Sequence, residues 1–246
     1  MFKCRRVGTL AVSVVMLAFA PGASAGEMRL MPNAVVELFT SQGCSSCPPA
    51  DALLEELAQR PDLVTLTYHV DYWDYIGWPD SFGSKDNSDR QRAYAERWGS
   101  ARVFTPQLIV NGSHGVVGSR RNEVATAIGD AELPLPVMLI HTGGDMLEIT
   151  IAAQAGLPDA LVWLVTYLDR ADVAIERGEN EGETIAYTQI VTGRQLLGMW
   201  EAETGTHLKL PIGEVLTAPS NGVAVLVQEE HDGLPGHILG AATFER

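Results

Sequence analysis

The sequence predicts an α/β domain followed by a β-rich region, with the change near Pro134–Pro136. Before this point, strand and helix patterns alternate along the chain. After it, the pattern is mainly short strands, punctuated by turn dipeptides such as Asn221-Gly222 and Asp232-Gly233. Strands joined by helices favour parallel neighbours, whereas strands joined by tight turns pair antiparallel. We therefore expect a mixed sheet with helices on both faces, followed by a sandwich-like β domain.

Four strands are predicted in the first part, and they are expected at residues 34–39, 63–70, 107–110 and 115–117. The third and fourth are separated by Asn111-Gly112, which is the strongest hairpin signal in the chain. These two strands should therefore be antiparallel, while the earlier strands are expected to run parallel.

Three helices are predicted between and after these strands. A helix over 50–59 places three leucines on one face and follows Pro48-Pro49, whose missing N–H groups cost little in a first turn. A Ser-x-x-Gln capping box predicts a second helix over 88–98. Ser119 is the expected N-cap of a third helix.

The β-rich part is expected to form a domain of its own over residues 134–246, separate from an α/β domain over 26–133. A charged turn at 177–183 is interpreted as a solvated loop. Seven strands are predicted, at residues 137–141, 146–153, 161–167, 183–191, 207–210, 223–228 and 238–244.

Residues 1–25 predict a cleaved secretory signal peptide. Lys3, Arg5 and Arg6 precede an apolar run over 7–20, and Ala23-Ser24-Ala25 supplies the small residues that a signal peptidase requires. The apolar run is shorter than the roughly 20 residues that a spanning helix needs. We therefore expect a bacterial protein that is periplasmic or secreted and has no membrane span after cleavage.

Cleavage would also change the charge and the cysteine content. The formal net charge of −14 becomes −17, because three positive residues and no negative ones are removed. So acidic a protein should not bind nucleic acid, whose phosphates would repel it. Cleavage also removes Cys4, which leaves Cys44 and Cys47 in a compartment where a disulfide persists.

The Cys44-Ser45-Ser46-Cys47 motif lies between a predicted strand and a predicted helix. The N-terminus of a helix carries partial positive charge, which favours a thiolate at Cys44, and the thiolate is the nucleophile in disulfide exchange. The two-residue spacing lets Cys47 reach back and displace a bound partner. The motif therefore predicts thiol–disulfide chemistry that needs no cofactor.

Other readings of this cysteine pair remain open. A purely structural disulfide would close a very small loop and would contribute only about 2 kcal/mol in the loop-closure picture. A zinc site would need two more ligands, and no second cysteine pair or paired histidine spacing exists. A copper-binding or carrier protein could use the two thiolates with His69 or His114. The fold could also serve as a binding module without catalysis.

Two further segments are candidates for the surroundings of the cysteines. Thr105-Pro106 lies just before the third strand, where proline can open a strand. Asp71, Trp73, Asp74 and Trp78 follow the second strand and could line a substrate groove. Loop and core packing is the competing interpretation, because buried aromatic side chains are common after a central strand.

Residues 34–131 resemble a thioredoxin-like domain, and nearly the whole mature chain is similar to a family of secreted bacterial proteins known only as a domain of unknown function. The resemblance is carried by Glu37–Asp51, by His69–Asp74 with Gly77-Trp78, and by Thr105–Gln107. It implies the fold and an exported location, but it supplies no substrate.

Carried over to this sequence, the resemblance implies that Cys44 is the attacking thiol, Cys47 the resolving thiol and Pro106 a cis-proline, beside which Thr105 positions a partner. The partners would be protein or small-molecule thiols and disulfides. Ser45-Ser46 replaces the Gly-Pro that is usual between the cysteines of thioredoxins, and no tryptophan precedes Cys44. The direction of electron flow therefore stays open.

Overall fold

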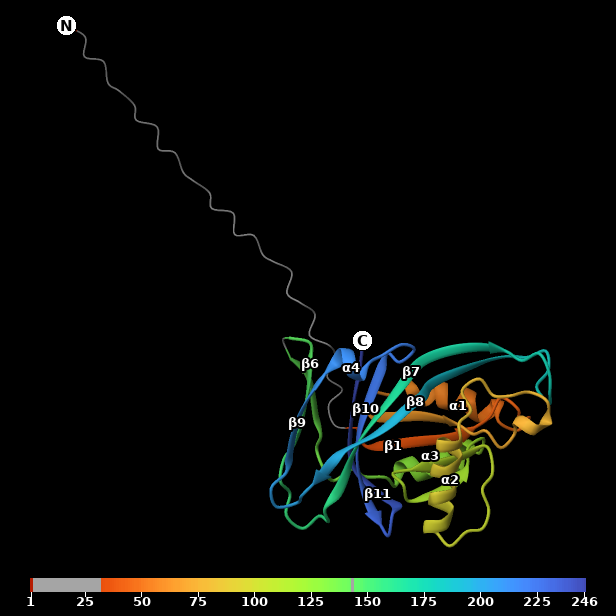
Figure 1. Ribbon diagram of the computed structural model, residues 1–246, viewed down its shortest axis with the longest axis horizontal. Helices are drawn as coiled ribbons and strands as arrows, with labels where there is room; N and C mark the ends of the chain where they lie inside the picture. Colours follow the sequence, from red (N-terminus) through yellow and green to blue (C-terminus); the bar gives the residue numbers. More distant parts are fainter. Residues whose placement is uncertain (2–31, 143) are drawn as a thin grey trace.

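The computed structural model describes residues 1, 32–142 and 144–246 (Figure 1). The signal peptide predicted for residues 1–25 therefore falls outside the described residues, Met1 excepted. The strands are β1 (Ala34–Thr40), β2 (Leu63–His69), β3 (Gln107–Val110), β4 (His114–Val117), β5 (Met138–Thr142), β6 (Met146–Ile151), β7 (Ala160–Ala174), β8 (Thr184–Trp200), β9 (Thr206–Pro211), β10 (Gly222–His231) and β11 (Leu234–Glu245). The helices are α1 (Pro48–Ala58), the short 3-10 helix η1 (Asp74–Ile76), α2 (Lys85–Arg97), α3 (Arg121–Gly129) and α4 (Ile212–Val215).

The described strands form an eight-stranded mixed sheet, in the order β11-β10-β7-β8-β2-β1-β3-β4, and a three-stranded sheet, β5-β6-β9. β1 and β2 are parallel, as predicted, and the β3–β4 hairpin is antiparallel. The parallel orientation expected of β3 is wrong, because β3 runs antiparallel to β1. The segment after α2 brings the chain back to the carboxyl end of β1, where Phe39 pairs with Gln107, so β3 enters the sheet from that end.

Helices cover both faces of this sheet, as predicted. α1 and α3 bury their leucines, valine and isoleucine in one core, and α2 packs Tyr94 into a second core on the opposite face. Two helix starts differ from the prediction. The N-cap of α2 is Ser84, whose hydroxyl accepts the N–H of Asn87, so Ser88 lies inside the helix. The N-cap of α3 is Arg120 instead of Ser119, and it makes no side-chain capping bond.

All seven strands predicted in the β-rich part are present, but β7 and β8 are longer than expected. They span 15 and 17 residues and pair along almost their whole length. Charged residues after Tyr167 hide the extension of β7 in the sequence, while β8 extends beyond the expected strand at its carboxyl end. In the structure, the outer half of the hairpin buries Ile175, Ile185 and Tyr187 against Trp78, so it gains an apolar partner from a distant loop.

The large sheet takes strands from both sides of residue 134. β8 lies beside β2, and the two strands pair in parallel through Thr67 and Ile190. The three-stranded sheet packs its inner face, including Leu147 and Ile149, on residues of β7, β10 and β11. The division into domains 26–133 and 134–246 stays a prediction.

Candidate functional site

A disulfide joins Cys44 and Cys47 at the carboxyl end of β1, an interior strand between β2 and β3 of the large sheet. Cys47 is the N-cap residue of α1, and Pro48 is its first residue, so the pair lies at a helix N-terminus as predicted. The Cα atoms of the two cysteines are 5.4 Å apart. Cys44 is 1% exposed and Cys47 is 0% exposed, so a partner reaches either sulfur only after local movement.

Local hydrogen bonds hold the loop between β1 and α1. The Ser41 carbonyl accepts the Cys44 N–H at 3.1 Å, and the Cys44 carbonyl accepts the Cys47 N–H at 3.1 Å. The Gln42 N–H donates to Asp80 Oδ2 at 2.8 Å, and the Gly43 N–H donates to Ser41 Oγ at 3.1 Å. The conformation of the loop is thus fixed by side chains as well as by its own backbone.

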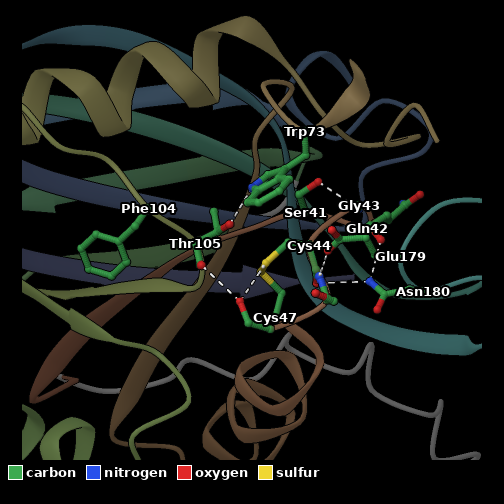
Figure 2. The surroundings of a disulfide bond; sticks show 12 residues. Ser41, Gln42, Gly43, Cys44, Cys47, Trp73, Phe104, Thr105, Glu179 and Asn180 are labelled. Carbon is green, nitrogen blue, oxygen red and sulfur yellow. Dashed lines mark hydrogen bonds between the residues drawn. A yellow bond between two sulfur atoms is a disulfide. The ribbon is translucent and has the colours of Figure 1, made fainter. Parts of the chain in front are cut away.

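Trp73 and Thr105 border one side of the disulfide (Figure 2). The Trp73 indole N–H donates to Thr105 Oγ1 at 2.7 Å, which links two loops that are far apart in the sequence. The Ser46 hydroxyl donates to the Thr105 carbonyl at 3.5 Å and lies 3.4 Å from Cys44 Sγ. The Thr105–Pro106 peptide bond is cis. The structure thus brings Trp73, Thr105 and the cysteine pair together.

The other three residues predicted for a groove brace loops. Asp71 accepts a hydrogen bond from the Ser88 hydroxyl of α2 at 2.5 Å. Asp74 Oδ1 accepts the Asp80 N–H at 3.0 Å, and burial raises the pKa of Asp74 above its ordinary value. Trp78 donates through its indole N–H to Gln42 Oε1 at 2.8 Å, so it holds the disulfide loop from the outside.

A buried polar cluster near α1 was not predicted from the sequence. Asp51 is 4% exposed, and neither of its carboxylate oxygens makes a hydrogen bond to the described residues. Burial raises its pKa to about 7, and the charge of His69 offsets only part of that effect. The Thr40 hydroxyl beside it also lowers the pKa of Asp51. The same cluster contains two further buried atoms without a partner among the described residues, namely His69 Nε2 and the Tyr187 hydroxyl.

His69 and Asp80 form the other side of this cluster, and their side chains are completely buried. His69 Nδ1 lies 2.8 Å from Asp80 Oδ2. Burial alone would raise the pKa of Asp80, but His69 and the N–H groups of Gln42 and Phe82 outweigh it and hold that pKa below its ordinary value. Through Gln42, the Asp80 carboxylate connects the cluster to the disulfide loop.

The sequence did contain a signal for Asp51. It follows Cys47 by four residues and precedes Leu54 by three, so helical spacing places it on the buried face of α1. An acidic residue at such a position is unusual and marks a candidate functional group.

The charged turn at 177–183 is not the fully solvated loop that the sequence predicted, because part of it is buried against the disulfide loop. Asn180 is 7% exposed, and its side-chain amide donates to the carbonyls of Gln42 and Cys44 at 2.8 and 3.2 Å (Figure 2). Glu179 accepts the Ser45 N–H at 3.3 Å. These contacts join residues 134 to 138 positions apart in the chain, so no local sequence pattern could predict them.

The copper hypothesis named His69 or His114 as a ligand; His69 Nδ1 lies against Asp80, while its Nε2 has no partner among the described residues. In the part of the chain that the structure describes, no three His, Cys, Asp or Glu side chains gather in a way that could hold a metal ion. Among the same residues, no helix is long and apolar enough to cross a membrane.

The fold and site define a mixed α/β protein with a buried disulfide at the N-terminus of a helix. Residues 35–228 match the family described as "Protein of unknown function (DUF1223)", and the chain belongs to this family. The uncharacterised family expected from the sequence is therefore confirmed. A search of curated proteins found no match.

Two solved structures are similar to the chain. One is a crystal structure of a protein from Agrobacterium tumefaciens, which is 36% identical, covers 87% of this chain and 95% of its own, and has a TM-score of 0.77. The other is HBP35 of Porphyromonas gingivalis, which is 16% identical, covers 87% of this chain and 74% of its own, and has a TM-score of 0.57. The second likeness concerns the fold alone.

Proposed function

We propose that the protein is an exported thiol–disulfide oxidoreductase that acts through Cys44 and Cys47 in the periplasm or outside the cell. The observation that carries the proposal is the disulfide between these residues at the N-terminus of α1. Helix N-terminal charge stabilises a thiolate, and a thiolate at Cys44 is the group that exchange requires. The partners are protein or small-molecule thiols and disulfides, and nucleic acid is not among them.

We also propose a thioredoxin-like domain over residues 26–133 and a sandwich-like β domain over 134–246. Support for the first comes from the central β1 strand, the disulfide before α1 and the cis bond before Pro106, which follow the pattern that the sequence resemblance implies. Support for the second comes from the packing of the β5-β6-β9 sheet on β7, β10 and β11.

Starting from the oxidised protein, the chemistry is a two-step exchange. A partner thiolate attacks the Cys44 sulfur, the Cys44–Cys47 bond breaks, and Cys47 leaves as a thiolate that takes up a proton. The partner's second thiol loses its proton, attacks the partner sulfur of the mixed disulfide and releases the Cys44 thiolate. The partner loses two electrons and the protein gains them, and the reverse sequence reduces a partner disulfide.

Residues around the disulfide have distinct parts in this scheme. Thr105 and Pro106, with Trp73 bonded to Thr105, form the side of the site on which a partner chain is positioned. Asp51 lies one helical turn beyond Cys47, and a carboxyl group with a pKa of about 7 can hold the proton that Cys47 exchanges. Asp71, Asp74 and Trp78 keep the surrounding loops in place.

A second candidate is a thioredoxin-like binding module without catalysis. The burial of both cysteines favours it, since redox-active cysteines are usually accessible and structural ones are buried. In that case the disulfide would hold the loop before α1, and the β-rich part would provide the working surface.

Trapping a mixed disulfide separates the two candidates. In the Cys47→Ser variant, Cys44 has no resolving partner, so oxidised glutathione should form a stable mixed disulfide on Cys44, detected by mass spectrometry. In Cys44→Ser, Cys47 should react at least about tenfold more slowly, because the proposal makes Cys44 the attacking thiol. Ser45→Ala is the control and should still exchange. Equal, slow reaction of both cysteines would favour the binding module.

A further inference from the structure

The tip of the β7–β8 hairpin, residues 175–183, lies against the loop that carries Cys44 (Figure 1). Asn180 is buried although the residues around it are charged and mostly exposed. Its amide group donates two hydrogen bonds, to the carbonyl of Gln42 at 2.8 Å and to that of Cys44 at 3.2 Å. The tip is therefore anchored on the main chain of the disulfide loop.

Of these two carbonyls, that of Cys44 also accepts the Cys47 N–H, whereas that of Gln42 depends on the Asn180 amide. Gln42 lies in an irregular, buried loop outside the strands. Leaving its buried carbonyl unpaired costs free energy, so the loop conformation that keeps the Gln42 carbonyl on Asn180 is favoured. In the structure, this is the conformation in which Cys44 and Cys47 are joined.

Glu179 adds a charge at the same place. Its carboxylate accepts the Ser45 N–H at 3.3 Å, between the two cysteines and at the N-terminus of α1. A negative charge here opposes the helix N-terminal field, which would otherwise favour a thiolate at Cys44. The charge of Glu179 therefore disfavours the reduced cysteine pair. The loop conformation that Asn180 stabilises acts in the same direction, because it is the one in which Cys44 and Cys47 are joined.

We propose that this hairpin tip sets the equilibrium between the dithiol and the disulfide. Asn180 acts as a positioning residue, and the charge of Glu179 acts on the Cys44 thiolate. The proposal rests on the thiol–disulfide function proposed above. Asn180 keeps Cys44 within reach of Cys47, which raises the effective concentration of one thiol at the other. Because Asn180 belongs to the β-rich part of the chain, the proposal gives that part a direct role at the cysteine site.

The test measures the equilibrium constant of the Cys44–Cys47 pair with glutathione for the full chain and its variants. Asn180→Ala should shift the equilibrium roughly five- to tenfold toward the dithiol, because the buried Gln42 carbonyl loses its donor and the Cys44 carbonyl loses one of two. Glu179→Gln, at an exposed position that tolerates substitution, should shift it about twofold in the same direction. Cys47 should also resolve the transient mixed disulfide between Cys44 and glutathione more slowly in Asn180→Ala than in wild type.

Matched controls separate positioning from general destabilisation. Asn111→Ala removes a similarly buried amide at the β3–β4 turn, and Glu181→Gln removes an exposed carboxylate from the same tip. Both should keep the wild-type equilibrium constant, even where Asn111→Ala unfolds at lower temperature. Equilibrium constants for Asn180→Ala and Glu179→Gln equal to wild type would overturn the proposal. If Asn180→Ala does not fold, the Glu179→Gln result decides.

The same equilibria can be measured with dithiothreitol, which reduces structural disulfides as well. If wild type does not exchange with glutathione, the proposed function fails. The effect of the hairpin tip can still be measured from the equilibrium constants of wild type and variants with dithiothreitol. If wild type exchanges rapidly and the variants match it, the tip proposal alone fails.

Discussion

Replacement of Asp51 by asparagine is expected to raise the free energy of unfolding relative to wild type more at about pH 8 than at acid pH. The difference between variant and wild type should grow by roughly 2 to 4 kcal/mol between the two conditions. Asp51 is buried, and its pKa in the folded protein is raised to about 7 from its ordinary value of 3.8. Between these values the folded protein holds a proton that the unfolded chain has lost, so the stability contributed by this group falls as the pH rises through 7. Asparagine cannot ionise and removes this loss.

Urea denaturation of wild type and Asp51→Asn at about pH 5 and about pH 8 tests the expectation. The free energy of unfolding of the variant should increase relative to that of wild type as the pH rises. The exposed Asp130→Asn variant also removes one negative charge and should show no such pH-dependent gain. A difference between Asp51→Asn and wild type that is the same at both pH values would mean that Asp51 is not a buried, neutralised acid.

Replacement of Arg90 by methionine is expected to destabilise the protein by about 3 to 5 kcal/mol, because it leaves a buried carboxylate without its partner. Arg90 donates through Nε and Nη2 to Glu37 Oε1 at 2.9 and 2.6 Å, and Glu37 is 0% exposed. Tyr94 donates its hydroxyl to Glu37 Oε2 at 2.6 Å, and Arg90 also bonds Gln228 of β10. The network therefore joins β1, α2 and a strand from the β-rich part.

A double-mutant cycle tests this account. Combining Glu37→Gln with Arg90→Met removes the uncompensated charge, so the double variant should lose less stability than the two single variants added together. Arg92→Met, at an exposed position two residues further along α2, should change stability by less than about 1 kcal/mol. A small effect of Arg90→Met alone would contradict the account, because the buried Glu37 would then not depend on Arg90.

Most of the secondary structure could be predicted because it depends on local patterns. β1, α1, β2 and β3 lie close to their predicted positions, and the Asn111-Gly112 turn forms the expected hairpin. The strand neighbours could not be predicted. The pairing of β8 with β2 joins residues more than 120 positions apart, and periodicity gives no information on such contacts. The capping box at Ser88 failed because Ser84 offers an alternative start one turn earlier.

The site shows the same limit. The cysteine pair and Thr105 are recognisable because their function depends on short spacing and on position relative to a strand or helix. Asp51 could have been found by helical spacing from Cys47. Asn180 could not, because its role depends on a hairpin whose length is set by packing against Trp78.

The reduction potential of the Cys44–Cys47 pair in glutathione buffers is the most direct test of the central claim. The proposed function predicts rapid equilibration and a potential between about −120 and −270 mV, the range of thiol–disulfide oxidoreductases. A value near the upper end would define an oxidant and one near the lower end a reductant. A potential well below about −300 mV, approached slowly, would contradict the proposal and identify a structural disulfide.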